Sequence, residues 1–116
     1  MKERNDLFFL NHIIESIELI EEFSENLTKL ELEKNKLKQS AIIRQIEIIG
    51  EAVKNLPVEF TSKYPSVSWS EIARARDKLI HHYFGVDLKI ILNIIKISLP
   101  KLKKQIQEII RKEERK

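Results

Sequence analysis

The spacing of the apolar residues is the feature that most limits what this chain can fold into. Over long segments they recur every three or four positions, the period of an amphipathic helix, with charged residues on the opposite side. The 116 residues include only two glycines and three prolines, too few for an all-β or loop-rich fold. We therefore expect an all-α protein, an antiparallel bundle of four to five helices.

Two helices are predicted in the first half of the chain. The first covers about residues 6–23 or a little more, and the second covers about residues 40–56, ending before Pro57 because proline disfavours helix in the residue before it. Gly50 costs the second helix roughly 1 kcal/mol relative to alanine, which a close helix crossing would explain. Residues 24–39 either continue the first helix or form a loop. The stripe of the first helix consists of Leu10, Ile13, Ile14, Ile17 and Ile20.

A third helix is expected to begin at residue 68. Ser68 and Glu71 have the spacing of a capping box, in which the serine oxygen accepts a backbone N–H and the glutamate reaches back. Gly85 should end this helix, because glycine adopts the left-handed conformation without a Cβ penalty. Asp87 can then cap a fourth helix.

The fourth helix has an unusually wide apolar surface. This breadth suggests burial against a partner and predicts a homodimer, although a central core helix in a monomer is the alternative. Pro100 can either open a fifth helix at its first turn or kink a continuous one. The charged end, residues 111–116, is expected to fray. The apolar residues are Ile90, Ile91, Leu92, Ile94, Ile95 and Ile97.

Length and composition narrow the class of protein. The chain has the size of a single domain, residues 1–116. The absence of cysteine excludes disulfides, thiolate metal sites and a cysteine nucleophile. No segment reaches the ~18 apolar residues of a membrane span, and the N-terminus lacks the apolar stretch of a secretion signal, so we expect a cytoplasmic protein.

Charge is unevenly distributed along the chain. Residues 1–34 carry 4 basic and 9 acidic side chains, a net charge of −5, whereas residues 35–116 carry 17 basic and 9 acidic, a net charge of +8. This asymmetry is compatible with a polyanion that contacts the second part of the chain. The alternative is a solvated surface of salt bridges.

Arg76, His81 and Tyr83 are predicted to gather near the far end of the third helix. Histidine, with an ordinary pKa of about 6.5, exchanges protons near neutral pH, and the planar guanidinium of arginine fits phosphate oxygens. The pair therefore suits a phosphodiester substrate. Five residues rotate about 140° along a helix, so either the arm of Arg76 wraps round or the pair works across an interface with a second copy. From composition alone, a surface ion pair for Arg76 and an interfacial position for His81 are the favoured interpretation, because arginine and histidine are ordinary helix residues.

The stretch Arg-Asp-Lys-Leu-Ile-His-His-Tyr at residues 76–83 resembles the Arg-x4-6-His motif of HEPN domains, in the Arg-x4-His-x-Tyr form of the HepT toxin family. Ile-Glu-Ile-Ile-Gly-Glu-Ala at residues 46–52 resembles the second-helix signature of the family. Phe-Gly-Val-Asp at 84–87 also resembles a family element, and the likeness covers roughly residues 40–105. Asp77 replaces a common asparagine; four residues before His81 on the same helix face, it could raise the pKa of that histidine. Glu51 either hydrogen-bonds a cation such as Arg76 or lies at the surface.

The resemblance implies a homodimeric, metal-independent ribonuclease that needs no cofactor. By the same resemblance, the chain would be the toxin of a type VII HEPN/MNT toxin–antitoxin system, and the motif helices of two copies would meet at the dimer interface. Arg76 would bind the RNA phosphate, and His81 would act as general base and acid, with His82 in a lesser, supporting role. The resemblance also implies that a partner, a minimal nucleotidyltransferase antitoxin, neutralises the toxin by transferring AMP to Tyr83.

Three other functional classes compete with a ribonuclease. A non-catalytic HEPN subunit that binds nucleotide or regulates a two-component nucleotidyltransferase is the main alternative. A DNA-binding helix-turn-helix is disfavoured, because no polar recognition face follows residues 84–87. A metal enzyme is disfavoured too, since His12, His81 and His82 do not form a ligand triplet.

Overall fold

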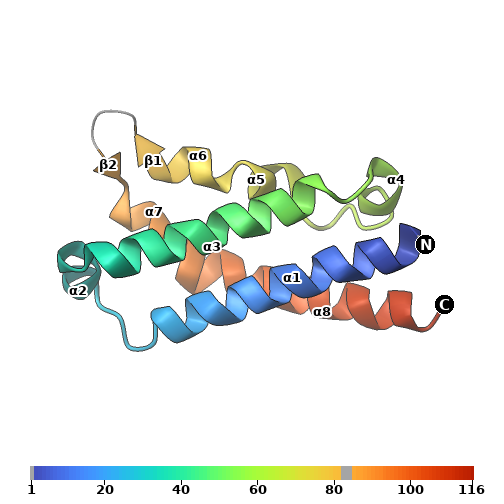
Figure 1. Cartoon of the computed structure of the whole chain (residues 1–116), viewed down its shortest axis with the longest axis horizontal. Helices are drawn as coiled ribbons and strands as arrows, with labels where there is room; N and C mark the ends of the chain where they lie inside the picture. Colours follow the sequence, from blue (N-terminus) through green and yellow to red (C-terminus); the bar gives the residue numbers. More distant parts are fainter. Residues whose placement is uncertain (1, 82–84) are drawn as a thin grey trace.

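The computed structural model describes residues 2–81 and 85–116, with the side chains of residues 5–80 and 85–116. Helices dominate this part of the chain, which confirms the all-α prediction (Figure 1). One two-stranded antiparallel sheet interrupts them. The elements are α1 Lys2–Phe23, α2 Lys29–Lys34, α3 Lys36–Lys54, α4 Val58–Thr61, α5 Trp69–Ala73, α6 Ala75–Leu79, β1 Ile80–His81, β2 Gly85–Val86, α7 Leu88–Asn93, the π-helix η1 Ile94–Ser98, and α8 Leu99–Glu114.

The core lies between the long helices. In Figure 1, α1 runs antiparallel to both α3 and α8 and packs against both, while α5 and α6 run along α3 in the opposite direction to it. The predicted stripe of α1 is confirmed at four positions: Leu10, Ile13 and Ile17 are fully buried and Ile20 is nearly so. Ile14, the fifth, is only partly buried.

The sequence left open whether residues 24–39 continue α1 or form a loop. In the structure they do neither, because they contain α2 and the start of α3. Thr28 caps α2: its hydroxyl accepts the N–H of Glu31 at 3.1 Å and donates to the carboxylate of the same residue, also at 3.1 Å. Asn35 then caps α3 by accepting the N–H of Lys38 at 2.9 Å. Because of this cap, α3 begins four residues before the predicted start at Ser40.

The prediction of one continuous third helix from residue 68 up to Gly85 is wrong over the second half of that range. Ser68 is the N-cap of α5, but its side chain makes no capping hydrogen bond, so the predicted capping box does not form. The helix breaks at Arg74, resumes as α6 and ends at Leu79. Residues 80–86 include β-branched and aromatic side chains that favour extended structure. β1 and β2 accordingly form an antiparallel pair, with Ile80 opposite Val86.

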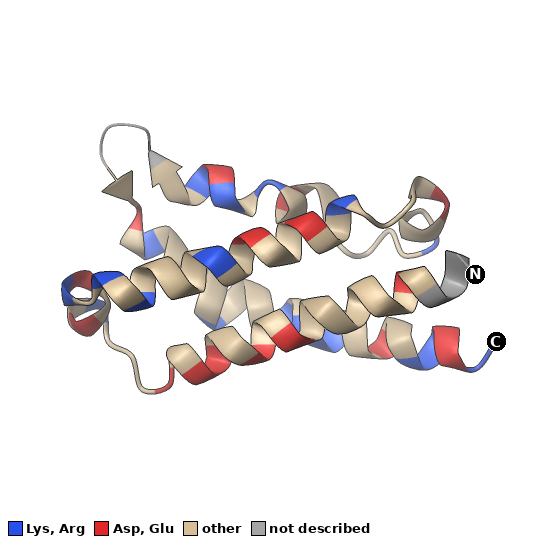
Figure 2. Ribbon diagram, in the orientation of Figure 1, with Lys and Arg blue, Asp and Glu red and all other residues tan. Residues whose placement is uncertain are grey.

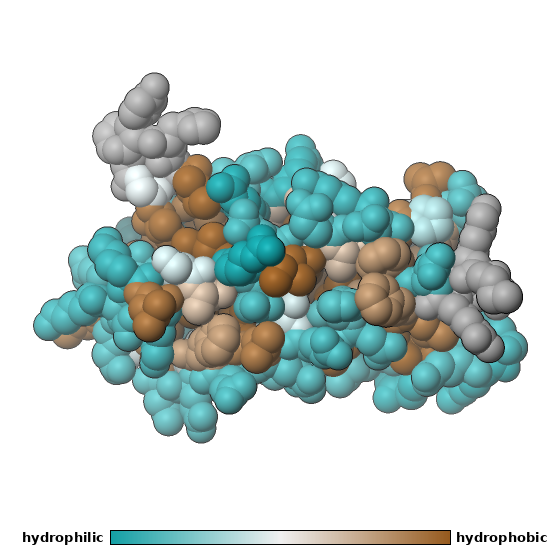
Figure 3. All heavy atoms as spheres, viewed as in Figure 1, coloured by the Kyte–Doolittle hydropathy of each residue, from teal (hydrophilic) through white to brown (hydrophobic). Residues whose placement is uncertain are grey.

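Gly85 and Asp87 keep part of their predicted roles. Gly85 has a φ of +78°, the left-handed conformation that glycine allows, but it lies in β2 and does not end a helix. Asp87 caps α7, accepting the N–H groups of Lys89 and Ile90 at 3.1 and 3.2 Å. Apolar side chains reach the surface beside the two strands (Figure 3).

Pro100 lies in a helical segment that runs without a break from Leu88 to Glu114. The N–H of Leu99 bonds to the carbonyl of Ile94, five residues back, which is a π-type bond. Proline lacks an N–H and its ring clashes with the carbonyl four residues before it. The wider turn just before Pro100 accommodates both effects. Pro100 lies in the first turn of α8, as the first predicted alternative has it, although α8 follows η1 without a break.

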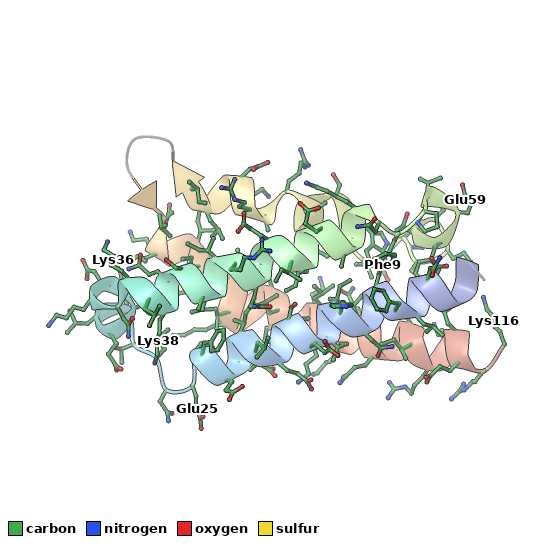
Figure 4. The ribbon with its side chains drawn as sticks, in the orientation of Figure 1. Phe9, Glu25, Lys36, Lys38, Glu59 and Lys116 are labelled. Atoms are coloured by element: carbon green, nitrogen blue, oxygen red, sulfur yellow. The ribbon has the colours of Figure 1, made fainter. Side chains whose placement is uncertain are left out.

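The predicted fraying of residues 111–116 is contradicted over most of its length. α8 extends to Glu114, and the Glu113 side chain, only 5% exposed, accepts the hydroxyl of Tyr64 from the connector after α4. Lys63 and Lys116 lie 3.5 and 3.1 Å from the same carboxylate. Figure 4 shows Lys116 and Glu59 at the end of the molecule opposite Lys36 and Lys38. The contacts of Glu113 with Tyr64 and Lys63 therefore join α8 to the connector that follows α4.

We expect Tyr64→Phe to destabilise the protein by about 1 kcal/mol at neutral pH, because Glu113 loses a hydrogen-bond donor. Burial alone would raise the pKa of Glu113, but the hydrogen bonds from Tyr64 and Lys116 and the charge of Lys63 outweigh it and lower that pKa below its usual 4.5. A carboxyl with a lowered pKa adds stability that is lost as the pH falls through its folded value.

The cost of Tyr64→Phe should therefore shrink in acid as Glu113 becomes protonated. Urea denaturation at pH 7 and pH 3 measures this difference. Glu114→Gln, which changes the neighbouring exposed carboxylate, is the control and should have little effect. An equal loss for Tyr64→Phe at both pH values would contradict this account of Glu113.

Candidate functional site

Arg76, the first residue of the motif, pairs with α3. Its Nε lies 2.6 Å from Oε2 of Glu47, and its side chain is 50% exposed. The other carboxylate oxygen of Glu47 lies 4.0 Å from Nη1 of Arg44, one turn earlier on α3. Leu79, fully buried on α6, anchors the short motif helix in the core. The guanidinium is thus held from one side and open to solvent on another.

Gly50 sets the distance between α3 and the motif segment. A Cβ at this position would lie 3.2 Å from the carbonyl oxygen of Ala73, closer than side chains ordinarily approach. The close crossing expected from the sequence is therefore confirmed. Three residues before Gly50 is Glu47, and three residues after Ala73 is Arg76, as the antiparallel course of the two segments requires. The glycine contact thus fixes the register that brings Glu47 to Arg76.

A polar pocket of about 200 Å³ lies beside this ion pair, between α3 and the α5–α6 segment. Glu51 and Asp77 line it together with Arg76, so three of the predicted site residues meet here. Glu51 is exposed, and the ion pair that the structure gives Arg76 is to Glu47. In Figure 2, charged segments of α6 lie next to charged segments in the middle of α3. The lining residues are Ile46, Glu47, Gly50, Glu51, Lys54, Ala73, Arg76 and Asp77.

His81 lies in β1, where its backbone is opposite Gly85. Because α6 ends at Leu79 and Ile80 is already extended, Arg76 and His81 do not share one helix. The predicted i, i+4 helical relation between Asp77 and His81 is therefore wrong. The side chain of His81 and all of His82 and Tyr83 lie outside the described residues. The predicted roles of these three residues stay predictions.

A larger groove, of about 390 Å³, lies between the α5–α6 segment and the α7–η1–α8 helix. Ala75 and Lys78 of α6 line this groove, whereas Arg76 and Asp77 line the polar pocket. Ile97 is 64% exposed at the groove. The apolar breadth predicted for residues 90–97 thus includes surface as well as core. The other apolar residues of the groove from this helix are Ile90, Ile94, Leu99 and Leu102.

The described residues contain no group of three His, Cys, Asp or Glu side chains that could hold a metal ion. Among these residues, no helix is long and apolar enough to cross a membrane. What the pocket does offer is a half-exposed guanidinium with a fixed counterion, which can bind a phosphate oxygen through its remaining N–H groups.

A family model described as Ribonuclease HepT-like matches residues 13–109, most of the chain. The chain belongs to the HepT-like family. A protein of Methanocaldococcus jannaschii named "Gamma-glutamylcyclotransferase and putative RNase" is 52% identical over 101 residues, which are 87% of this chain but only 46% of that protein. This chain therefore spans about half the length of that relative.

Two further relatives match the HepT-like chain over nearly their whole length. One, named "Putative RNase", is from the same organism and is 47% identical over 96% of this chain and 92% of its own. The other, "Probable ribonuclease HepT" of Thermococcus cleftensis, is 43% identical over 92% of this chain and 97% of its own. No solved structure matches the chain significantly.

The structure adds one site residue of this HepT-like chain that sequence reasoning missed. Glu47 contacts Arg76, whereas Glu51 was the residue considered for that contact. A signal was present, because Glu47 is a polar residue that interrupts the apolar stripe of α3 one turn before Gly50. That interruption did not identify its partner, which comes from another helix.

Proposed function

We propose that this chain is the toxin of a HEPN/MNT toxin–antitoxin system, a single HEPN domain over residues 1–116 that cleaves RNA without a metal ion. Membership in the HepT-like family supports ribonuclease activity. The observation that carries the proposal is Arg76: the arginine of the family motif is half exposed at a polar pocket.

The proposed reaction is an attack of the RNA 2′-OH on the adjacent phosphorus. His81 takes the 2′-OH proton, the bond from 2′-oxygen to phosphorus forms, and the bond from phosphorus to the 5′-oxygen breaks. His81 returns a proton to the leaving 5′-oxygen. Arg76 binds the non-bridging phosphate oxygens and stabilises the charge that develops in the transition state. The products are a 2′,3′-cyclic phosphate and a 5′-hydroxyl.

The proposed active form is a homodimer in which two copies of the motif complete one cleft. The exposed apolar groove between the α5–α6 segment and η1 supports this proposal, since it adjoins the motif helix through Ala75 and Lys78. A second copy covering Ile97 would bury an apolar side chain that is now 64% exposed.

We expect Ile97→Glu to convert the dimer to a monomer and to abolish RNA cleavage while the helical fold persists. A carboxylate buried in an apolar interface without a partner is strongly unfavourable, and the exposed position tolerates it in the monomer. Light scattering at micromolar concentration, circular dichroism and an RNA cleavage assay measure the three effects.

Val58→Glu is the matched control, because Val58 is 70% exposed on α4 and does not line the groove. It should remain dimeric and active. A wild-type chain that is monomeric at these concentrations, or an Ile97→Glu variant that stays dimeric, would contradict the proposed interface.

The test of the proposed function is cleavage of single-stranded RNA by the purified chain in EDTA. We expect the RNA to be cut and DNA of the same sequence to stay intact, because DNA lacks the attacking 2′-OH. Binding of nucleotide without any cleavage would favour a regulatory HEPN subunit instead.

A further inference from the structure

The guanidinium of Arg76 is held by a residue of α3, outside the Arg-x4-His motif itself. Its Nε lies 2.6 Å from Oε2 of Glu47, and Oε1 of the same carboxylate faces Arg44 at 4.0 Å. We propose that Glu47 is a positioning residue, which directs the Arg76 guanidinium toward the substrate phosphate. This inference rests on the proposed function of Arg76 in RNA cleavage.

The geometry of the contact leaves Arg76 able to act. Glu47 approaches the guanidinium at Nε, and the side chain of Arg76 remains 50% exposed, so the terminal amino groups are available to phosphate oxygens. A free arginine side chain occupies many rotamers, whereas one held by a carboxylate is ordered before the substrate arrives. Misplacing a catalytic group by about 1 Å can cost up to 100-fold in rate.

Glu47 is well placed for this role because its own position is fixed. It lies in the middle of α3, the longest helix after α1, and only 29% of its side chain is exposed. One turn later, Gly50 lies so close to the carbonyl of Ala73 that a Cβ would be 3.2 Å from its oxygen. This close approach fixes the register between α3 and the motif segment. Glu51, one turn beyond Glu47 on α3, lines the same pocket without this contact.

Loss of a negative charge, loss of positioning and disruption of the fold are expected to change different measured quantities. A carboxylate beside Arg76 weakens the attraction of that arginine for phosphate, so its removal should leave RNA binding unchanged or make it tighter. Loss of positioning should instead lower the rate of the chemical step. Disruption of the fold would weaken binding and lower the melting temperature together. Measuring RNA affinity, the rate of the chemical step and the melting temperature together therefore distinguishes a charge effect, a positioning role and a structural role.

The experiment compares Glu47→Gln with wild type in kcat, KM, melting temperature and affinity for a 2′-O-methyl RNA that cannot be cut. We expect kcat to fall about tenfold or more, KM and the affinity to stay equal or improve, and the melting temperature to change little, because exposed ion pairs contribute little stability. Glu47→Asp keeps the charge and should recover part of kcat. Glu59→Gln, at an exposed glutamate of α4 that lines neither the polar pocket nor the groove, is the control and should cleave at the wild-type rate.

Each other outcome overturns the inference. If Glu47→Gln retains the wild-type kcat, Glu47 does not position Arg76 for catalysis. If binding weakens in step with melting temperature in both Glu47 variants, the role is structural. If wild type cuts RNA but Arg76→Ala does so equally well, or if wild type cuts none, the proposed function fails and the positioning role falls with it. The Arg76→Ala and wild-type assays thus distinguish the two failures.

Discussion

Arg76→Ala should lower the rate of RNA cleavage by about 100- to 1,000-fold, because it removes the group that stabilises charge on the phosphate in the transition state. His81→Ala should have an effect of at least similar size, since general acid–base catalysis contributes about 100- to 10,000-fold. Single-turnover cleavage of a labelled RNA, with the variants at saturating concentration, measures the chemical step directly.

Two controls test whether these losses are specific. Arg74→Ala removes a second arginine two residues from Arg76, one whose Nε donates to the backbone carbonyl of Ser70 at 3.3 Å, and should cleave at nearly the wild-type rate. His12→Ala removes a histidine of α1, far along the chain from the motif, and should also be active. Circular dichroism should show wild-type helicity for Arg76→Ala, whose side chain is half exposed. Full activity in Arg76→Ala or His81→Ala would refute the assigned roles.

We propose that a nucleotidyltransferase antitoxin modifies Tyr83, so Tyr83→Phe should make the proposed toxin resistant to that partner while leaving RNA cleavage intact. In the proposed mechanism, the nucleotidyltransferase transfers AMP from ATP to the Tyr83 hydroxyl and releases pyrophosphate. The added phosphate brings negative charge close in sequence to Arg76 and His81, where it should compete with the RNA backbone. Phenylalanine has no hydroxyl to accept the nucleotide. The expected effect in cells is complete loss of neutralisation.

Intact mass after incubation with the nucleotidyltransferase and ATP is the direct measurement for this switch. Wild type should gain the mass of one or more AMP groups and lose activity, whereas Tyr83→Phe should gain none. Tyr64→Phe is the matched control, because the other tyrosine of the chain donates to Glu113 and should not be modified. Modification that persists in Tyr83→Phe, or a modified wild type that still cleaves RNA, would contradict the proposal.

Helix-period apolar stripes were enough to predict the long helices, because each buries one face against the same core. The errors came where local preferences compete. Thr28 accepts the N–H of Glu31, the kind of side-chain cap that was expected of Ser68, whereas Ser68 makes no such bond. The same Ser/Thr-x-x-Glu spacing therefore caps α2 but not α5. Residues 80–81 and 85–86 form a strand pair where a helix was expected, since the β-branched and aromatic residues of this part of the sequence favour extended backbone.

The candidate site was predictable only in part. The family motif identified Arg76, and the glycine in α3 predicted a close crossing that the structure confirms. The partner of Arg76 was not predictable, because Glu47 and Glu51 are one turn apart on the same side of α3. Only the register set by Gly50 against Ala73 selects Glu47, and that register is a tertiary property.

A single 2′-deoxy substitution in an RNA substrate tests the central claim most directly. The position of cleavage is first mapped on the all-ribose RNA in EDTA, and the ribose that supplies the 2′-OH at that position is then replaced. The account predicts that cleavage at this bond disappears while other sites are still cut, and that products from the unmodified RNA carry 2′,3′-cyclic phosphate and 5′-hydroxyl ends. Cleavage that persists at the substituted position, or that stops in EDTA and returns with added Mg²⁺, would contradict it.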